Sequence, residues 1–369
     1  MVDILVSPQA GMPERHTEEN SRLASLQAII AAIRVRSQAI QTGRGASAAS
    51  PCGLPMVRVF DPTIKPTEGL SAERDVTKRE QRIVSILRER GCLRVLGAVA
   101  SPTLAAAIAQ LFDTHENFTK AIDYLLGEEI LLRRQEGALC GVRLLLYGGA
   151  GVGKTHFALT LAKLLDLPAE VIGLSSAQAA AFLSGSEQYW SNSQPGLVWK
   201  QIIQGAYANP IVVLDEIDKV TDKWGDPLGA LYQLLEGHSA SIFCDKSIPW
   251  LPIDASRVNW VATANDVERL HPAIRSRFFE VEVTSPTEDA LRGLLQRLYS
   301  DLLSEFSLTD RFARELTPVQ FRALSGVSVR DAKRILRAAV GLALRDESKD
   351  LVLMTPPQRD VGRQRMGFI

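Results

Sequence analysis

The hydrophobic pattern divides the chain into a central region of alternating character and helical flanks. Between Leu139 and Val283, short runs of β-branched and other apolar residues alternate with stretches of helical periodicity. This alternation is typical of a three-layer sandwich, in which helices cover both faces of a parallel sheet. Strands are predicted at 142–147, 170–174, 211–214, 258–262 and 279–283. The sequence therefore predicts an α/β domain with a parallel five-stranded sheet.

A change of periodicity after the last predicted strand marks an all-helical unit. Helix-start signals occur at Ser285-Pro286-Thr287-Glu288, Thr317-Pro318-Val319-Gln320 and Ser328. A Ser or Thr followed by Glu or Gln satisfies the free N–H groups at a helix start, and Pro fits the first turn. We therefore expect a small helical lid domain at 285–350, after an α/β domain at 113–284 and before a C-terminal tail at 351–369.

The first 112 residues give weaker signals. The pattern at 17–41 suits either an amphipathic helix or a marginal, disordered arm, because such a helix has little to pack on. The stretch 42–69 is rich in Gly, Pro, Ser and Ala, as linkers are. Residues 1–70 are therefore expected to be a flexible arm and linker, and 71–112 a helical prefix with a helix starting at Ser101-Pro102.

Composition narrows the class of protein without identifying it. Lys plus Arg equals Asp plus Glu, at 42 each, so the overall charge gives no reason to expect nucleic acid or an anionic membrane as the main partner. No stretch approaches the roughly 18 apolar residues of a membrane span, and the N-terminus is too charged for a signal peptide. The 4 cysteines form no metal-ligand or redox spacing. A cytoplasmic location is therefore expected.

A glycine-rich string between the first predicted strand and the following helix is the strongest chemical signal. It fits the pattern G-x-x-x-x-G-K-[ST] in the strand–loop–helix context that this pattern requires. Its residues are Gly148, Gly149, Ala150, Gly151, Val152, Gly153, Lys154 and Thr155. Glycines let the backbone wrap round a phosphate and present N–H groups at a helix N-terminus. Lys154 would reach the β- and γ-phosphates of ATP, and the Thr155 hydroxyl would hold Mg²⁺.

Two carboxylates follow the third predicted strand. Asp215 and Glu216 come directly after the apolar run Ile211–Leu214, about sixty residues beyond the glycine-rich string. Asp215 would hold Mg²⁺ through its hydration shell, and Glu216 would polarise the attacking water as general base. The alternative is an acidic surface turn after a core strand, but the distance from the phosphate loop favours the catalytic interpretation.

Taken in order, these strings resemble those of AAA+ ATPases over roughly residues 113–347. The resemblance rests on Gly148–Thr155, Asp215-Glu216, Ala262-Thr263-Ala264-Asn265, Arg275-Ser276-Arg277-Phe278 and Ser328-Val329-Arg330-Asp331. Flanking strings are most similar to the ATPase module of Lon-type proteases. They are Asn209-Pro210, Asp226-Pro227-Leu228-Gly229-Ala230-Leu231 and Asp254-Ala255-Ser256-Arg257-Val258. The segment 237–257 also resembles the hairpin that precedes the fourth strand in this branch.

The resemblance implies roles for further polar residues. Asn265 would be the sensor that orients the lytic water, since an amide both donates and accepts hydrogen bonds. Arg277, with Arg275 as the alternative, would be an arginine finger acting in the site of a neighbouring subunit. Arg330 would be a second sensor that links nucleotide state to the lid. A finger that acts in trans implies a homo-oligomeric ring, for which a hexamer is the first expectation.

An aromatic pair between the second and third predicted strands resembles a Lon-type loop that faces the central channel of the ring. Tyr189 and Trp190 would grip an extended polypeptide, because large flat side chains give contact area without demanding a particular sequence. The alternative is a buried aromatic pair that holds the loop down. One extra residue before Pro195 leaves the register of this loop open.

The resemblance implies an ATPase that uses ATP and Mg²⁺ and remodels or unfolds protein substrates. The chain ends soon after the last predicted helix, so no peptidase domain follows and no peptidase activity is expected of it alone. Two other functions stay open: a motor that remodels nucleic acid, and a switch in which ATP binding orders a complex. A balanced charge argues against the first, so neither nucleic acid nor a membrane is an expected partner.

Overall fold

A computed structural model gives the fold of the chain. It describes residues 53–66, 74–174, 179–187, 193–220, 229–325, 327–348 and 350–353. The helix considered at 17–41, the aromatic pair Tyr189-Trp190 and the string Asp226-Pro227-Leu228 lie outside the described residues. Within these ranges, no helix has both the length and the apolar character needed to cross a bilayer.

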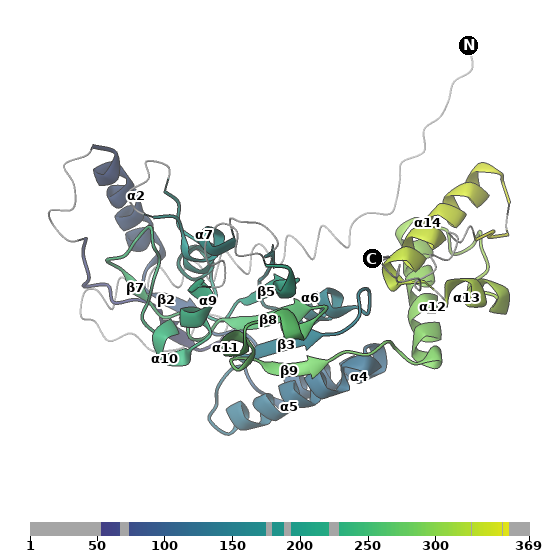
Figure 1. The fold of residues 1–369 in the computed structure, drawn as a ribbon, viewed down its shortest axis with the longest axis horizontal. Coiled ribbons are helices and arrows are strands. Elements are labelled where there is room, and N and C mark those ends of the chain that lie inside the picture. The colour runs from purple at the N-terminus through teal and green to yellow at the C-terminus, as the bar shows by residue number, and fades with distance from the viewer. Residues whose placement is uncertain are drawn as a thin grey trace, which may run out of the picture.

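The centre of the molecule is the predicted parallel sheet of five strands (Figure 1). All neighbouring strands in this sheet run parallel. Their spatial order is β4 (Ala169–Gly173), β5 (Ile211–Asp215), β8 (Asn259–Ala264), β3 (Arg143–Tyr147) and β9 (Phe279–Glu282). The expectation of an α/β fold built on this sheet is confirmed. Because β3 lies between β8 and β9, the loop after β3 opens at the same edge as the ends of β5 and β8.

Alternate residues of the strands supply two separate apolar cores. Leu144, Val213 and Val261 face one layer, which contains side chains from α3 (Pro102–Ala109), α4 (Leu111–Thr114), α5 (Thr119–Arg133) and α6 (Lys154–Leu164). Val212 and Trp260 face the other layer, formed by α2 (Arg74–Arg90), α7 (Ala179–Ser184), α8 (Leu197–Trp199), the π-helical turn Lys200–Gln204 and α9 (Gly229–Leu234). Burial on both faces explains why the central strands β3, β5 and β8 contain continuous apolar runs, whereas the edge strands β4 and β9 contain Glu residues.

The N-terminal segment is more ordered than its composition indicates. Residues 56–58 lie within the expected linker, yet they form β1 (Met56–Arg58), which pairs antiparallel with β2 (Leu93–Val95). Val59 and Phe60 continue into the core beside α2. The segment is rich in Gly, Pro, Ser and Ala as a whole, but the short run Met56–Phe60 contains none of these residues and buries Val59 and Phe60. Helix α3 of the expected separate prefix likewise shares its core with the sheet.

A short hairpin and single-turn helices complete the α/β unit. The expected hairpin before the fourth strand of the main sheet is present as β6 (Phe243–Cys244) and β7 (Pro252–Ile253), which pair antiparallel. Helix α10 (Gly237–Ala240) precedes it. Helix α11 (Pro272–Arg275) precedes β9, and single 3-10 turns lie at Glu116–Phe118, Ile217–Lys219 and Val267–Arg269.

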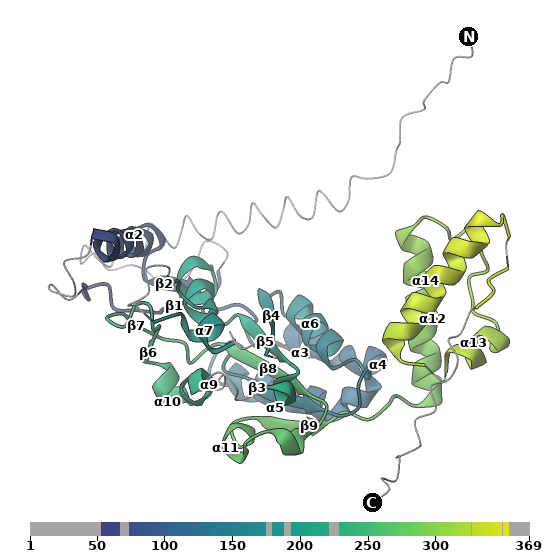
Figure 2. The ribbon, with the colours of Figure 1, turned by 45° about the horizontal axis from the view of Figure 1, so that its top comes forward.

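The helical unit lies at one end of the sheet and has a core of its own (Figure 2). Its helices are α12 (Glu288–Glu305), α13 (Pro318–Leu324) and α14 (Val329–Arg345). The capping box at Thr317 and the cap at Ser328 are both present.

The capping box predicted at Ser285 is wrong, because the cap of α12 is Thr287. The Val283 N–H still bonds to Tyr147 of β3, and the Glu116 carboxylate accepts the Thr287 N–H and hydroxyl. The chain is thereby held extended up to Thr287, and the helix starts only after it.

Candidate active site

The glycine-rich string forms a tight loop between β3 and α6. Gly148 and Gly151 have φ angles of +144° and +82°, in the region that disfavours residues with a Cβ. A Cβ at Gly148 would lie 2.2 Å from the carbonyl oxygen of Val283, and one at Gly151 would lie 2.9 Å from Cβ of Ser328 in the lid. Glycine is therefore required for the loop to pass between the sheet and the lid.

Lys154 begins α6, and its ammonium group is held inside the loop. Nζ donates to the carbonyl oxygens of Gly148 (2.7 Å) and Gly149 (2.9 Å) and to Oδ1 of Asn265 (3.0 Å). Burial lowers the pKa of Lys154, while the nearby carboxylates of Asp218, Asp215 and Glu216 act in the opposite direction. The loop, the lysine and Asn265 thus form one hydrogen-bonded group at the end of the sheet.

Asp215 and Thr155 are brought together at the end of β5. Oδ1 of Asp215 accepts hydrogen bonds from the hydroxyls of Thr155 and Thr263, each 2.7 Å away. The described chain contains no cluster of three or more metal-ligating side chains. A carboxylate and a hydroxyl side by side are nevertheless the hard oxygen donors that suit Mg²⁺ when phosphate oxygens and waters supply the remaining ligands.

Thr263 is a site residue that the sequence did not single out. Its hydroxyl donates to Asp215 and accepts from the backbone N–H of Glu216 at 3.0 Å, so one buried group connects both acidic residues. The strand register explains this position: Leu214 is aligned with Ala262, which places Thr263 beside Asp215. Thr263 belongs to the string Ala262-Thr263-Ala264-Asn265, but its contact with Asp215 can be predicted only when β5 and β8 are known to be neighbours.

Glu216 lies in a left-handed backbone conformation, with φ +54°. Non-glycine residues rarely adopt this conformation, and where they do it is often at functional sites. The Glu216 carboxylate pairs with Nζ of Lys219 at 2.5 Å, and both side chains are about half exposed. Nearby, Asp218 is buried and accepts from the N–H of Asp266 at 3.1 Å, while its other oxygen has no hydrogen-bond partner among the described residues.

These residues line a cavity of about 570 Å³ between the sheet and the helical unit. Lys154, Asp215 and Asn265 lie on the sheet side. Helices α12 and α14 supply the opposite wall with Leu294, Arg297, Leu298, Asp301, Val329, Arg330 and Lys333. The cavity is therefore concave and mixed in polarity, with basic groups on both sides, as an anionic ligand of nucleotide size requires.

A pair of histidines forms another wall of this cavity. The rings of His115 and His156 stack with centroids 5.5 Å apart, and Nε2 of His115 lies 3.3 Å from Nδ1 of His156. Burial, together with His156 and Arg297, lowers the pKa of His115 to about 4. Phe118 and Phe157 stack behind the pair at 4.4 Å. Neutral imidazoles thus give a flat, weakly polar surface that no sequence motif indicated.

The three predicted arginines have different surroundings. Arg330 lines the cavity, whereas Arg275 and Arg277 do not. Arg275 donates from Nε and from a terminal nitrogen to both carboxylate oxygens of Glu280, each at 2.9 Å, and also contacts Glu268. Arg277 donates to the carbonyl of Ala273 and lies over the ring of Tyr232. Arg275 is therefore neutralised by carboxylates within the chain, while Arg277 has only uncharged neighbours among these contacts.

Comparison with known proteins agrees with this geometry. Residues 144–286 match the family model described as "ATPase family associated with various cellular activities (AAA)". A Lon protease of Amoebophilus asiaticus is 32% identical over 178 residues, which are 48% of this chain and 21% of that protein. The Lon protease of Finegoldia magna is 31% identical over 237 residues, 61% of this chain and 30% of that protein. The Lon protease of Campylobacter jejuni is 30% identical over 242 residues, 63% and 30% respectively.

A solved structure of a Thermotoga maritima RuvB mutant aligns with 64% of this chain and 66% of its own, at 19% identity and a TM-score of 0.43. The chain spans less than a third of each of these Lon proteases. Residues 144–286, which contain the phosphate loop and the acidic strand, are therefore an AAA ATPase domain, in a chain whose AAA region is homologous to Lon proteases.

Proposed function

We propose that the chain binds ATP with Mg²⁺ and hydrolyses it to ADP and phosphate. One observation carries the proposal: Lys154 is hydrogen-bonded to Asn265 and Thr155 to Asp215, and all four residues line a single cavity. A structural role alone would not require a lysine ammonium to be buried among carbonyl oxygens within a glycine loop.

The chemistry divides among the residues of the site as follows. The loop N–H groups and Lys154 hold the phosphates, and Thr155 and Asp215 hold Mg²⁺, which when bound offsets the charge of the phosphate oxygens. Glu216 accepts the proton of the attacking water, and Asn265 orients that water. The wall formed by His115 and His156 suits a planar base, because neutral imidazoles stack without repelling it.

In this proposal Arg330 acts in the cavity of its own chain, and Arg277 acts in the cavity of a neighbouring subunit. Arg330 and Lys333 belong to α14, so contact with a nucleotide would fix the angle between the α/β unit and the helical lid. Arg277 lies outside its own cavity and has no charged partner among its described contacts, so it is our candidate for the finger that enters a neighbouring subunit. This assignment makes the active unit a homo-oligomeric ring, with a hexamer as the working model.

We further propose that the ring acts on protein substrates. The relation to Lon proteases supports this choice, and we retain Tyr189 and Trp190 as the substrate-gripping residues, although they lie outside the described residues. Hydrolysis would then change the position of the lid relative to the sheet, and this movement would be transmitted to the substrate-gripping residues.

The test compares the full chain with its Glu216→Gln variant, using ATP and Mg²⁺. The wild type should hydrolyse ATP, and denatured casein should stimulate it more than DNA does. Glu216→Gln should retain bound ATP while turnover falls by about a hundredfold or more, because the general base is lost. Undiminished turnover in this variant would refute the assignment of Glu216, and stimulation by DNA alone would favour the nucleic-acid alternative.

A further inference from the structure

The loop between α7 and α8 has a closed neck. The N–H of Ser186 donates to the carbonyl of Gln194 at 3.2 Å, and the N–H of Gln194 donates to the Ser186 hydroxyl at 2.9 Å. The Ser193 hydroxyl donates to the carbonyl of Ser186 at 3.0 Å. We call residues 185–187 and 193–196 the neck, because these bonds hold its two segments side by side.

A buried carboxylate from the hairpin is hydrogen-bonded to the neck. Asp245 follows β6 and is fully buried. Its Oδ2 accepts the N–H of Gly196 at 2.8 Å, and its Oδ1 accepts the N–H and hydroxyl of Ser247 at 2.9 and 2.7 Å. A Cβ at Gly185, where φ is +81°, would lie 2.1 Å from Oδ1, so the carboxylate also packs directly on the first segment of the neck, residues 185–187.

The residue beside Asp245 adds two more connections. The N–H of Lys246 donates to the carbonyl of Ser184 at 2.8 Å, at the end of α7. The Lys246 ammonium pairs with Glu187 at 3.1 Å on the surface. Together, Asp245 and Lys246 are hydrogen-bonded to both segments of the neck, at Gly196 and Glu187. Neither segment can therefore shift relative to the hairpin without breaking a hydrogen bond.

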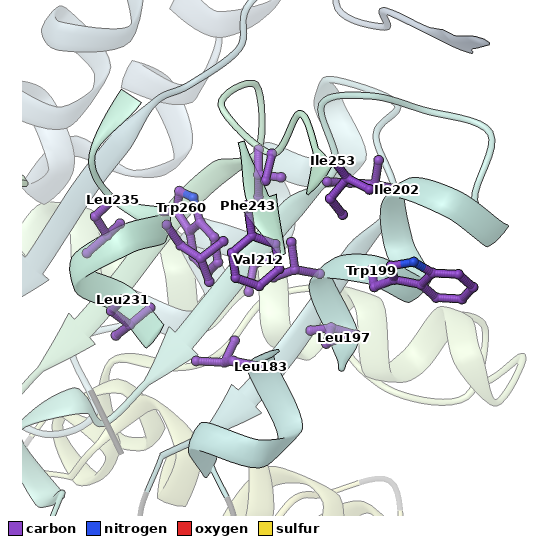
Figure 3. Close-up of a cluster of buried hydrophobic side chains, with 14 of the residues drawn as sticks. Leu183, Leu197, Trp199, Ile202, Val212, Leu231, Leu235, Phe243, Ile253 and Trp260 are labelled. Carbon is purple, nitrogen blue, oxygen red and sulfur yellow. The ribbon is translucent and has the colours of Figure 1, made fainter. Parts of the chain in front are cut away.

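The neck and the hairpin also share one core. Figure 3 shows Leu183 and Leu197, which flank the neck, in the same cluster as Phe243 and Ile253 of the hairpin and Val212 of β5. All of these side chains are buried. The polar connection at Asp245 therefore lies between segments that are already fixed to the central sheet.

We infer that Asp245 is a positioning residue, which joins the hairpin and the neck into one body and so fixes the two described ends of the segment between α7 and α8. The inference rests on the proposed function, in which this loop engages an unfolded polypeptide. A loop that does mechanical work has to be held at its base, because force on a flexible base is lost in local rearrangement. A buried acceptor for two backbone N–H groups and a hydroxyl supplies this attachment without touching the ATP site.

The test uses Asp245→Asn, with Ser247→Ala as matched control. Asn retains an acceptor for Ser247 but presents an N–H₂ group to the Gly196 N–H, whereas Ser247→Ala removes one donor to the carboxylate and leaves the neck bonded. Hydrogen exchange of the Gly196 amide should accelerate about tenfold or more in Asp245→Asn and stay unchanged in the control, since one buried hydrogen bond is lost.

The basal and the casein-stimulated ATPase rates together distinguish a positioning role of Asp245 from general damage to the fold. Asp245→Asn should keep the basal ATPase rate and the KM for ATP within about twofold, while stimulation by denatured casein falls at least about fivefold. A second variant, Gly185→Ala, should reproduce both effects, because its Cβ displaces the carboxylate. Gly127→Ala on α5, where a Cβ meets nothing within 4 Å, is its control.

Each outcome decides a separate point. Unchanged exchange at Gly196 in both Asp245→Asn and Gly185→Ala would overturn the attachment. Faster exchange with full casein stimulation would overturn the positioning role. A wild-type enzyme that casein does not stimulate would refute the proposed function and with it the positioning role, while the exchange measurement would still decide whether Asp245 holds the neck.

Discussion

Replacing Thr263 by valine tests the central connection of the site. The hydroxyl joins Asp215 to the backbone of Glu216, and the residue is 1% exposed. Valine has nearly the same shape, so the change removes two hydrogen bonds and leaves the packing of β8 in place. The variant therefore isolates the role of the Thr263 hydroxyl from the packing of its side chain.

The structure sets the expected magnitude. The bond to the Asp215 carboxylate involves a charged acceptor and is worth about 1.5–3 kcal/mol, and leaving the part-buried Glu216 N–H unpaired costs at most about 1–3 kcal/mol. These contributions overlap, since water can reach part of the site, so we expect the free energy of unfolding to fall by about 2–4 kcal/mol. The kcat should fall between about tenfold and a hundredfold, because the backbone of Glu216 loses the bond that holds its left-handed conformation.

The assay is steady-state ATP hydrolysis with Mg²⁺, together with urea unfolding of the same samples. Thr263→Ser is the control: it keeps the hydroxyl and should lose only about 1 kcal/mol of stability through the missing methyl group, with kcat within about threefold of wild type. The KM for ATP should change little in either variant. Equal kcat values for the valine and serine variants would refute the claim that this hydroxyl organises the acidic pair.

Three further predictions concern His115 in the cavity wall, the two candidate finger arginines and the ion pair of Glu216. Lowering the pH from about 6.5 towards 4 should lower the melting temperature, because the depressed pKa of His115 means that the unfolded chain binds protons first; His115→Phe should flatten this dependence, and an unaltered slope would contradict it. Arg277→Ala should abolish most ATPase activity at an unchanged melting temperature, whereas Arg275→Ala should lower the melting temperature because it releases two carboxylates; the reverse pattern would exchange their roles. Lys219→Gln should raise basal turnover by up to about fivefold, because it frees the catalytic glutamate from a half-exposed ion pair, and slower turnover would show that the lysine assists catalysis.

Local strings were enough to predict the sheet and most of the candidate site. The three central strands of the sheet contain continuous apolar runs, and the phosphate loop is a contiguous sequence directly after one of them, β3. Asp215 and Lys154 could be placed at a strand end and a helix start from such strings, because that local geometry is set by neighbours in sequence.

The features that escaped prediction depend on contacts between distant segments. Thr263 contacts Asp215 only because β8 is inserted next to β5, an arrangement that no local pattern encodes. His115 and His156 are 41 residues apart and meet only when α6 packs against the preceding helices. The N-cap of α12 is Thr287 instead of Ser285, because the distant Glu116 carboxylate holds the chain extended up to that residue. In each case tertiary contacts outweighed a local preference.

The pairing of β1 with β2 affects how shortened versions of this protein should be made. The N–H of Asp254 donates to Val59 at 2.7 Å and Phe60 forms a bridge with Ile253, so the segment at 56–60 covers both an open strand edge and the base of the hairpin. A truncated chain that starts after Phe60, and so keeps β2 but lacks β1, would leave Leu93–Val95 without its strand partner and the apolar surface beneath it open to water. Such an edge invites association with other chains, so poor behaviour of that fragment would reflect the missing cover rather than a defect of the ATPase domain.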